Sequence, residues 1–169
     1  MSANRELAVL RRYRRKIDRA RLEGGTLSDD FYNDADPASL ERAARRWYVE
    51  AIARVGPRSG VESVLLSLEN RRLPQVVFSD YYAEAKLESL GLSKYFAAVY
   101  VGERLGAVKP NCKVLLKIAA DFSVPVENIL HIGDRSDRDE AVAQAVGCRC
   151  LILGRDFRDF GSLRETLET

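Results

Sequence analysis

Four short apolar runs alternate with amphipathic segments in the second part of this 169-residue chain. The runs are QVVFSD, AAVYV, NILHIGD and RCLIL, at 75–80, 97–101, 128–134 and 149–153. Apolar residues recur at helical spacing around them, at 60–71, 81–89, 109–122, 138–146 and 161–168. This alternation is typical of an α/β fold in which helices cover both faces of a parallel sheet. The chain is long enough for one such domain with a small helical addition.

The first third of the chain has helical periodicity only. Apolar residues recur at helical spacing over 4–22 and 37–55, and the turn EGGTLSDD separates the two segments. Asp36 is a suitable N-cap for the second helix, and Pro37 suits its first position. We therefore expect a helical unit over 1–56, followed by the α/β part over 57–169.

Basic residues are concentrated at the start of the chain. Residues 1–21 hold eight Arg or Lys side chains against two acidic ones, Glu6 and Asp18. Such a segment could bind nucleic acid. Val9, Tyr13, Ile17 and Ala20 also recur on one helical face, however, and no aromatic platform accompanies the charge. We favour a helix with one buried face and one solvated basic face, and expect no nucleic-acid partner.

No part of the sequence indicates a membrane or an oxidising compartment. None of the apolar runs approaches the ~20 residues that a spanning helix needs. The start of the chain lacks the apolar core of a signal peptide. The cysteines, Cys112, Cys148 and Cys150, do not have the paired spacing of a disulfide framework or a zinc site. These features favour a cytoplasmic protein.

Polar side chains follow three of the predicted strands. Ser79 and Asp80 end the first run, Lys109 lies in the loop after the second, and a carboxylate cluster follows the third. The cluster consists of Asp134, Asp137 and Asp139. Loops at the carboxyl ends of parallel strands meet at one edge of the sheet. A hydroxyl and an ammonium can hold a phosphoryl group there, and carboxylates can hold Mg²⁺.

These three loops resemble conserved motifs of a known superfamily. VVFS with Ser79, GAVKPN with Lys109, and HIGDRSDRD with Gly133, Asp134 and Asp139 resemble motifs two, three and four of the haloacid dehalogenase superfamily. The resemblance covers about residues 58–155. Most members of that superfamily are Mg²⁺-dependent phosphatases, so it implies a phosphatase with a Rossmann-like parallel sheet, a helical cap over 1–56 and a small phosphorylated metabolite as substrate.

The resemblance also implies a role for each site residue. Ser79 and Lys109 would form the catalytic set, and Ser79, Asp80 and Lys109 would bind the substrate phosphate. Asp134 would bind Mg²⁺. Asp139 would belong to the same metal site and would orient that site or a metal-bound water. Asp137 is expected to face solvent. His131 points along its strand into the core, which favours a structural role over that of a general base.

The nucleophile of the superfamily is not found in this chain. It comes from a first motif, DxD at the end of an apolar strand, whose first aspartate forms an aspartyl-phosphate and whose second acts as general acid and base. Asp34 and Asp36 have DxD spacing, but TLSDDFY before them is not a buried strand. We therefore expect that Met1 is an internal start, that the central strand between those of Ser79 and Asp134 is missing, and that the chain alone has little phosphatase activity.

Two further interpretations stay open. The chain could be a non-catalytic relative that binds an anion, a metal or another protein through the same residues. The basic helix over 5–21 could instead bind nucleic acid. In either case, an unfilled sheet centre would favour a homo-oligomer or a strand-exchanged dimer.

Overall fold

Each of the four apolar runs forms a strand in the computed structural model, which describes residues 3–28, 31, 40 and 43–168. The strands are β1 (Val76–Ser79), β2 (Ala98–Val101), β3 (Leu130–Gly133) and β4 (Arg149–Ile152). Every strand lies inside its predicted run, because each run is apolar and is bounded by turn residues. The predicted α/β class is confirmed.

The strands form two separate parallel pairs. β1 pairs with β2, from Val76 opposite Ala98 to Ser79 opposite Val101. β3 pairs with β4 in the same direction. Among the residues that the structure describes, no strand pairing joins the two pairs. The parallel order is as predicted, and the sheet is divided between β1 and β3, where we expected a strand to be missing. Across this division, the rings of Phe78 and His131 lie edge to face, 6.2 Å apart.

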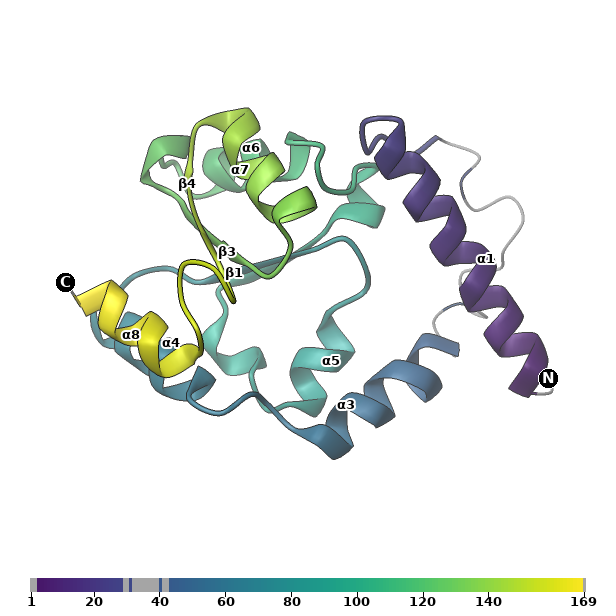
Figure 1. Cartoon of the computed structure of the whole chain (residues 1–169), viewed down its shortest axis with the longest axis horizontal. Helices are drawn as coiled ribbons and strands as arrows, with labels where there is room; N and C mark the ends of the chain where they lie inside the picture. Colours follow the sequence, from purple (N-terminus) through teal and green to yellow (C-terminus); the bar gives the residue numbers. More distant parts are fainter. Residues whose placement is uncertain (1–2, 29–30, 32–39, 41–42, 169) are drawn as a thin grey trace.

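Helices lie on both sides of the strands (Figure 1). One side carries α4 (Val61–Asn70), α5 (Glu84–Ser89) and α8 (Phe160–Glu168), and the other carries α6 (Lys113–Asp121) and α7 (Ala141–Val146). The shorter turns are η2 (Ser93–Tyr95), η3 (Gly102–Leu105), η4 (Val126–Asn128) and η5 (Ser136–Glu140). The apolar face of α6 packs against Ala143 and Cys148. On the opposite side, Leu163 of α8 packs against Val64 of α4. Both helical layers are therefore fixed by apolar burial.

The first helix, α1 (Ala3–Leu22), packs on the α/β part through its predicted apolar stripe. Ile17 is fully buried and contacts a cluster that includes Val108 of the loop after β2. The turn after α1 then joins the same loop, because the N–H of Val108 donates to the carbonyl of Gly25 at 2.7 Å. A Cβ at Gly25 would lie 2.1 Å from the carbonyl oxygen of Val108, so only glycine allows this approach.

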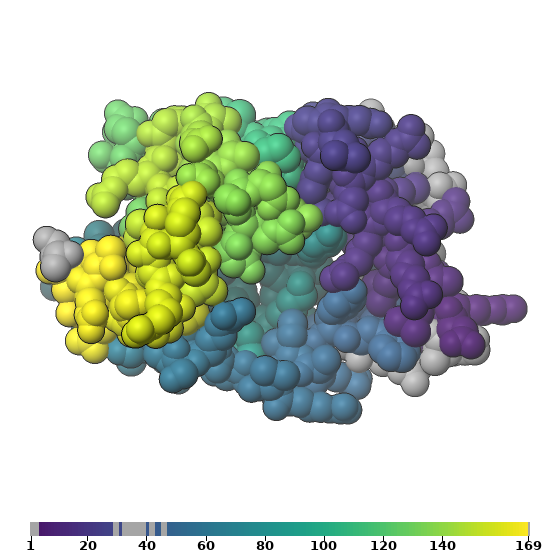
Figure 2. Space-filling model, viewed as in Figure 1, coloured from purple at the N-terminus to yellow at the C-terminus, as the bar shows by residue number. Residues whose placement is uncertain are grey.

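The second helical segment departs from the prediction. It is described as η1 (Arg45–Val49), a π-helix, followed by α3 (Glu50–Val55); Asp36 and Pro37 lie outside the described residues. We expected one buried face as far as Val55, yet Val55 is 85% exposed and no residue of α3 is buried. A π-helical turn shifts the phase of the helix, so residues spaced for a regular helix no longer share one face. Figure 2 shows a hollow at the centre of this face, where the purple, blue and green segments come together.

Candidate functional site

The carboxyl ends of β1 and β3 meet at Lys109. Its ammonium lies 2.6 Å from a carboxylate oxygen of Asp139 and 3.4 Å from the carbonyl oxygen of Phe78, in β1. The side chains of Lys109 and Asp139 are 12% and 6% exposed. The ammonium also lies 4.7 Å from the centre of the Phe78 ring. One buried cation therefore links the two strand pairs at the predicted edge.

Asp139 accepts hydrogen bonds on both of its oxygens. The oxygen that contacts Lys109 also lies 3.1 Å from His131 Nε2, and the backbone N–H groups of Asp134 and Arg135 donate to the other, at 3.2 and 3.1 Å. Burial alone would raise the pKa of Asp139, but the contacts with His131 and Lys109 outweigh it and hold that pKa well below its usual range. The carboxylate is thus charged, and both of its oxygens already accept hydrogen bonds from groups of this chain.

Gly133 allows Asp139 to approach the end of β3. A Cβ built on Gly133 would lie 2.3 Å from the carboxyl carbon of Asp139. This is far inside van der Waals contact, so a side chain at this position would displace the carboxylate. Gly133 therefore has a steric role, which the spacing of residues in the HIGDRSDRD motif did not indicate.

Asp80 joins the loop of Lys109 to α1. One of its oxygens accepts the backbone N–H of Lys109 at 2.8 Å, and the other accepts Arg21 Nη2 at 2.9 Å. The same Arg21 nitrogen donates to the hydroxyl of Tyr81 at 3.2 Å. Ser79, next to Asp80, ends β1, and its hydroxyl accepts the N–H of Tyr81 at 3.3 Å. The structure thus brings together the three residues predicted to bind phosphate, Ser79, Asp80 and Lys109.

Arg21 is the member of this site that sequence reasoning missed. We assigned it to the solvated face of the basic helix, which is wrong for this residue, because its side chain is only 7% exposed. Its Nε is buried and has no hydrogen-bond partner among the described residues. The available signal was its position, in the last turn of a helix just before a Gly-Gly turn. That turn directs the guanidinium back to the strand ends.

The last turn of α1 also lies against the loop that follows β3. Asp18 accepts a hydrogen bond from Arg21 and lies 4.0 Å from a guanidinium nitrogen of Arg138. Arg135 in the same loop pairs with Asp137 at 2.9 Å. Asp137 is 57% exposed, which confirms that it faces solvent. Cations from α1, from the Lys109 loop and from the loop after β3 therefore surround the strand ends, an arrangement suited to an anion.

The carboxylates at this edge supply only part of a metal site. Asp134 is exposed at the end of β3, whereas both oxygens of Asp139 are already hydrogen-bonded. Over residues 3–28, 31, 40 and 43–168, no group of three or more His, Cys, Asp or Glu side chains could hold a metal ion. Asp34 and Asp36 lie outside the described residues. One free carboxylate is therefore what the described site offers to Mg²⁺.

A parallel α/β core with a hydroxyl, a lysine and carboxylates at its strand ends defines a Rossmann-like hydrolase class. The sequence profile of the haloacid dehalogenase-like hydrolases matches residues 17–153, and the chain belongs to that family. The match confirms the resemblance drawn from the loop residues Ser79, Lys109 and Asp134.

Curated relatives of this chain include phosphatases. It is 28% identical over 151 residues to a phosphoglycolate phosphatase of Chromobacterium violaceum, covering 85% of this chain and 68% of the relative. It is 36% identical over 62 residues to a glyceraldehyde 3-phosphate phosphatase of Methanopyrus kandleri, covering 37% of this chain and 27% of that protein. The chain thus spans about two thirds of one relative and about a quarter of the other.

Solved structures share the fold. A HAD phosphatase from Thermococcus onnurineus superposes with a TM-score of 0.66 at 20% identity, covering 81% of this chain and 68% of that one. A predicted phosphoglycolate phosphatase from Haemophilus somnus gives 0.66 at 17% identity, covering 92% and 75%. None of the described helices is long and apolar enough to cross a membrane.

Proposed function

We propose that this chain is a phosphatase-type member of the haloacid dehalogenase-like hydrolases, and that its strand-end site binds the phosphate group of a small phosphorylated metabolite. The position of the Lys109 ammonium carries the proposal, because it is a buried cation at the point where the ends of β1 and β3 meet. A buried lysine is well suited to hold a phosphoryl oxygen. The curated phosphatase relatives favour the same chemistry.

In this proposal each site residue has a distinct task. Ser79 donates its hydroxyl to a phosphoryl oxygen, and Lys109 supplies the positive charge, so both contact the reacting group. Asp80 holds the backbone of Lys109 and the guanidinium of Arg21, which places two cations beside the phosphate. Asp139 positions Lys109.

Magnesium enters this proposal through Asp134. Mg²⁺ commonly takes one or two carboxylates together with phosphate oxygens and water, and it neutralises phosphate charge when bound. Asp134 offers the free carboxylate, whereas Asp139 acts through Lys109 because its oxygens are occupied. Among the described residues, Asp134 is the one free carboxylate at this edge, so they supply only part of a Mg²⁺ site.

Hydrolysis through an aspartyl-phosphate needs a carboxylate that is free to attack phosphorus. The described carboxylates beside Lys109 are engaged, Asp80 by Arg21 and Asp139 by Lys109 itself. We therefore propose that turnover requires a nucleophile segment other than the described residues. The helical residues 1–56 would act as a cap over the core of 57–169, in a cytoplasmic protein. A strand-exchanged dimer could complete the divided sheet.

The same observation favours a second candidate, a non-catalytic binding protein. Isothermal titration with inorganic phosphate and an assay of phosphate release from small esters, each with and without Mg²⁺, separate the two. We expect binding without measurable release, and at least about tenfold weaker binding by Lys109→Met. Lys113→Met, at an exposed position in the same segment, is the matched control. Measurable Mg²⁺-dependent release of phosphate would exclude the non-catalytic binding protein. The absence of phosphate binding would overturn both candidate functions.

A further inference from the structure

A cavity lies beside the phosphate site, between α1 and the loops that follow β1 and β2. Its volume is about 280 Å³. Four tyrosines dominate its wall, together with aliphatic side chains and a few charged ones. The lining residues are Leu10, Tyr13, Arg14, Leu40, Ala44, Tyr48, Tyr81, Tyr82, Lys86, Glu103 and Arg104. Tyrosine rings offer flat apolar faces with a polar tip, which suits a planar ligand.

Two cations in this wall, Lys86 and Arg14, have no anionic partner among the residues that the structure describes. The ammonium of Lys86 makes no hydrogen bond or ion pair with any other residue that the structure describes, whereas Arg104 pairs with Glu84. Burial lowers the pKa of Lys86, and the nearby Arg14 lowers it further. The Arg14 guanidinium itself lies 4.6 Å from the centre of the Tyr48 ring. A partly desolvated ammonium without a counter-charge is stabilised when an anion enters its pocket.

The acidic side chain in the wall does not neutralise this ammonium. Burial raises the pKa of Glu103 to about 7, against the smaller opposing effect of Arg104. Near neutral pH, Glu103 therefore carries only part of a charge. Arg14 and Lys86 are then the cations of the wall that have no carboxylate partner among the described residues, since Arg104 pairs with Glu84.

Tyr81 connects the wall of this cavity to the strand-end site. This residue lines the cavity, and its hydroxyl accepts a hydrogen bond from Arg21, which pairs with Asp80. The N–H of Glu103, another lining residue, donates to the carbonyl of Asp80 at 3.2 Å. Two wall residues of the cavity, Tyr81 and Glu103, are therefore linked to Asp80, which also holds the backbone of Lys109.

We propose that this cavity holds the leaving group of the phosphate ester, and that this group is an aromatic ring carrying a carboxylate paired with Lys86. The inference rests on the proposed phosphate site and names its substrate class. The tyrosine walls account for the ring, and the unpaired ammonium accounts for the carboxylate. A cavity of about 280 Å³ also exceeds what a two-carbon acid would fill.

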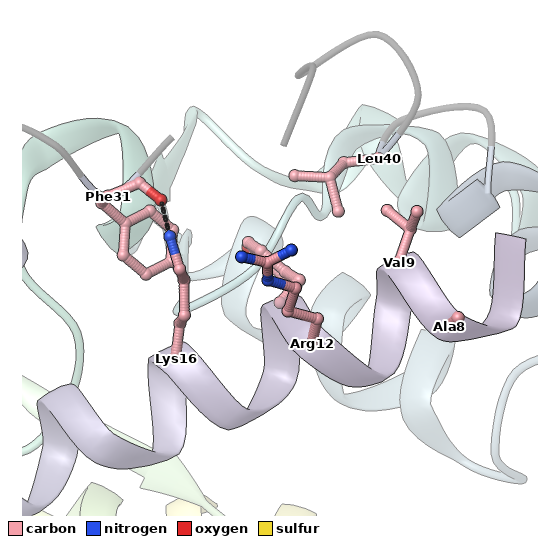
Figure 3. Close-up of a pocket in the computed structure, with 7 residues that line it drawn as sticks. Ala8, Val9, Arg12, Lys16, Phe31 and Leu40 are labelled. Carbon is pink, nitrogen blue, oxygen red and sulfur yellow. Dashed lines mark hydrogen bonds between the residues drawn. The ribbon is translucent and has the colours of Figure 1, made fainter. Parts of the chain in front are cut away.

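A second cavity shares Tyr13 and Leu40 with the first, but no residue of the loops after β1 and β2 lines it (Figure 3). Its volume is about 180 Å³, and Lys16 at its wall donates to the carbonyl of Phe31 at 2.9 Å. That ammonium already has an acceptor. Tyr81, which contacts Arg21, is not among its lining residues. The ligand is therefore assigned to the larger cavity alone.

The test compares binding of 4-carboxyphenyl phosphate and phenyl phosphate to the intact chain by isothermal titration. A carboxylate paired with Lys86 should strengthen binding at least about tenfold, because a charge-assisted contact in a desolvated site has that magnitude. Lys86→Met keeps the aliphatic stem of the side chain. It should abolish the difference in affinity between the two esters and leave the affinity for phenyl phosphate within about twofold of the native value. Lys94→Met, at an exposed lysine after α5, should leave both affinities unchanged.

Benzoate, observed by NMR, separates this inference from the proposed function. If the two phosphate esters bind equally, or if Lys86→Met keeps the difference, the inference is wrong while the phosphate site stands. If neither ester binds but benzoate binds and is lost in Lys86→Met, the cavity assignment stands and the proposed function is wrong. If no probe binds, both are overturned.

Discussion

The ammonium of Lys109 lies 2.6 Å from the carboxylate of Asp139, and the two side chains are only 12% and 6% exposed. Lys109 belongs to the loop after β2, and Asp139 to the turn after β3, so the contact connects two strand pairs that share no strand pairing in the described part of the chain. The pair therefore contributes both to holding the core together and to placing a cation at the strand ends.

Removing the cation of this pair should weaken folding as well as binding. Lys109→Met leaves Asp139 buried with only His131 and two backbone donors, and breaking a buried ion pair in this way costs about 3 kcal/mol in the free energy of unfolding. Urea denaturation measures it. Lys113→Met, at an exposed position, should change stability by less than about 0.5 kcal/mol. Equal effects of the two substitutions would show that the pair has no special role.

Two arginines of α1 provide a matched comparison. Arg21 is buried and paired with Asp80, while Arg19 is 81% exposed and paired with Glu23 in the same helix. Arg21→Met should cost about 3 kcal/mol because it leaves Asp80 buried beside a single backbone donor. Arg19→Met should cost less than about 1 kcal/mol. Thermal unfolding of both variants is the measurement, and similar losses would argue against Arg21 as an anchor of α1.

The close approach of Asp139 to β3 predicts a steric effect at Gly133. Gly133→Ala would force the carboxylate away and should cost about 2 kcal/mol, the magnitude of overpacking a filled site. Gly147→Ala serves as the comparison, because its Cβ would meet no atom within 4 Å and its cost of about 1 kcal/mol comes only from the left-handed backbone. The two free energies can be compared by urea denaturation. A Gly133→Ala variant that still binds phosphate like the native chain would contradict the assigned role of Asp139.

The pH dependence of stability should report the burial of Glu103. Burial raises its pKa from an ordinary 4.5 to about 7, so between these values the folded chain binds more protons than the unfolded chain. The contribution of Glu103 to the free energy of unfolding therefore falls as pH rises through this window, by about 2 kcal/mol after allowing for its partial exposure. Denaturation at pH 5 and pH 7.5 should show this fall in the native chain. Glu103→Gln should reduce it, and Glu88→Gln, at an exposed residue, should not.

Much of the fold could be predicted from the sequence because its signals are local. The apolar runs and the helical periodicities each reflect burial of the element that carries them, as in β3 and α6. The grouping of Ser79, Asp80, Lys109 and Asp139 could also be predicted, since parallel strands bring their carboxyl ends to one edge.

What could not be predicted depends on tertiary contacts. Nothing local distinguishes Arg21 from the exposed Arg19, because its burial arises from Asp80 and Tyr81, which are distant in sequence. The π-helix at Arg45–Val49 likewise changes which residues face the core, and periodicity cannot detect this. The tyrosine-lined cavity combines residues of four segments that are distant in sequence, and no local pattern indicates that they meet.

The most direct test of the proposed phosphate site is an NMR titration of the isotope-labelled chain with inorganic phosphate. We expect saturable amide shifts at Ser79, Asp80 and Lys109, with smaller shifts in the loop after β3 around Asp134. Lys109→Met should remove these shifts at the same phosphate concentration. Saturable shifts confined to the basic face of α1, or no shifts at the strand ends, would contradict a phosphate site there.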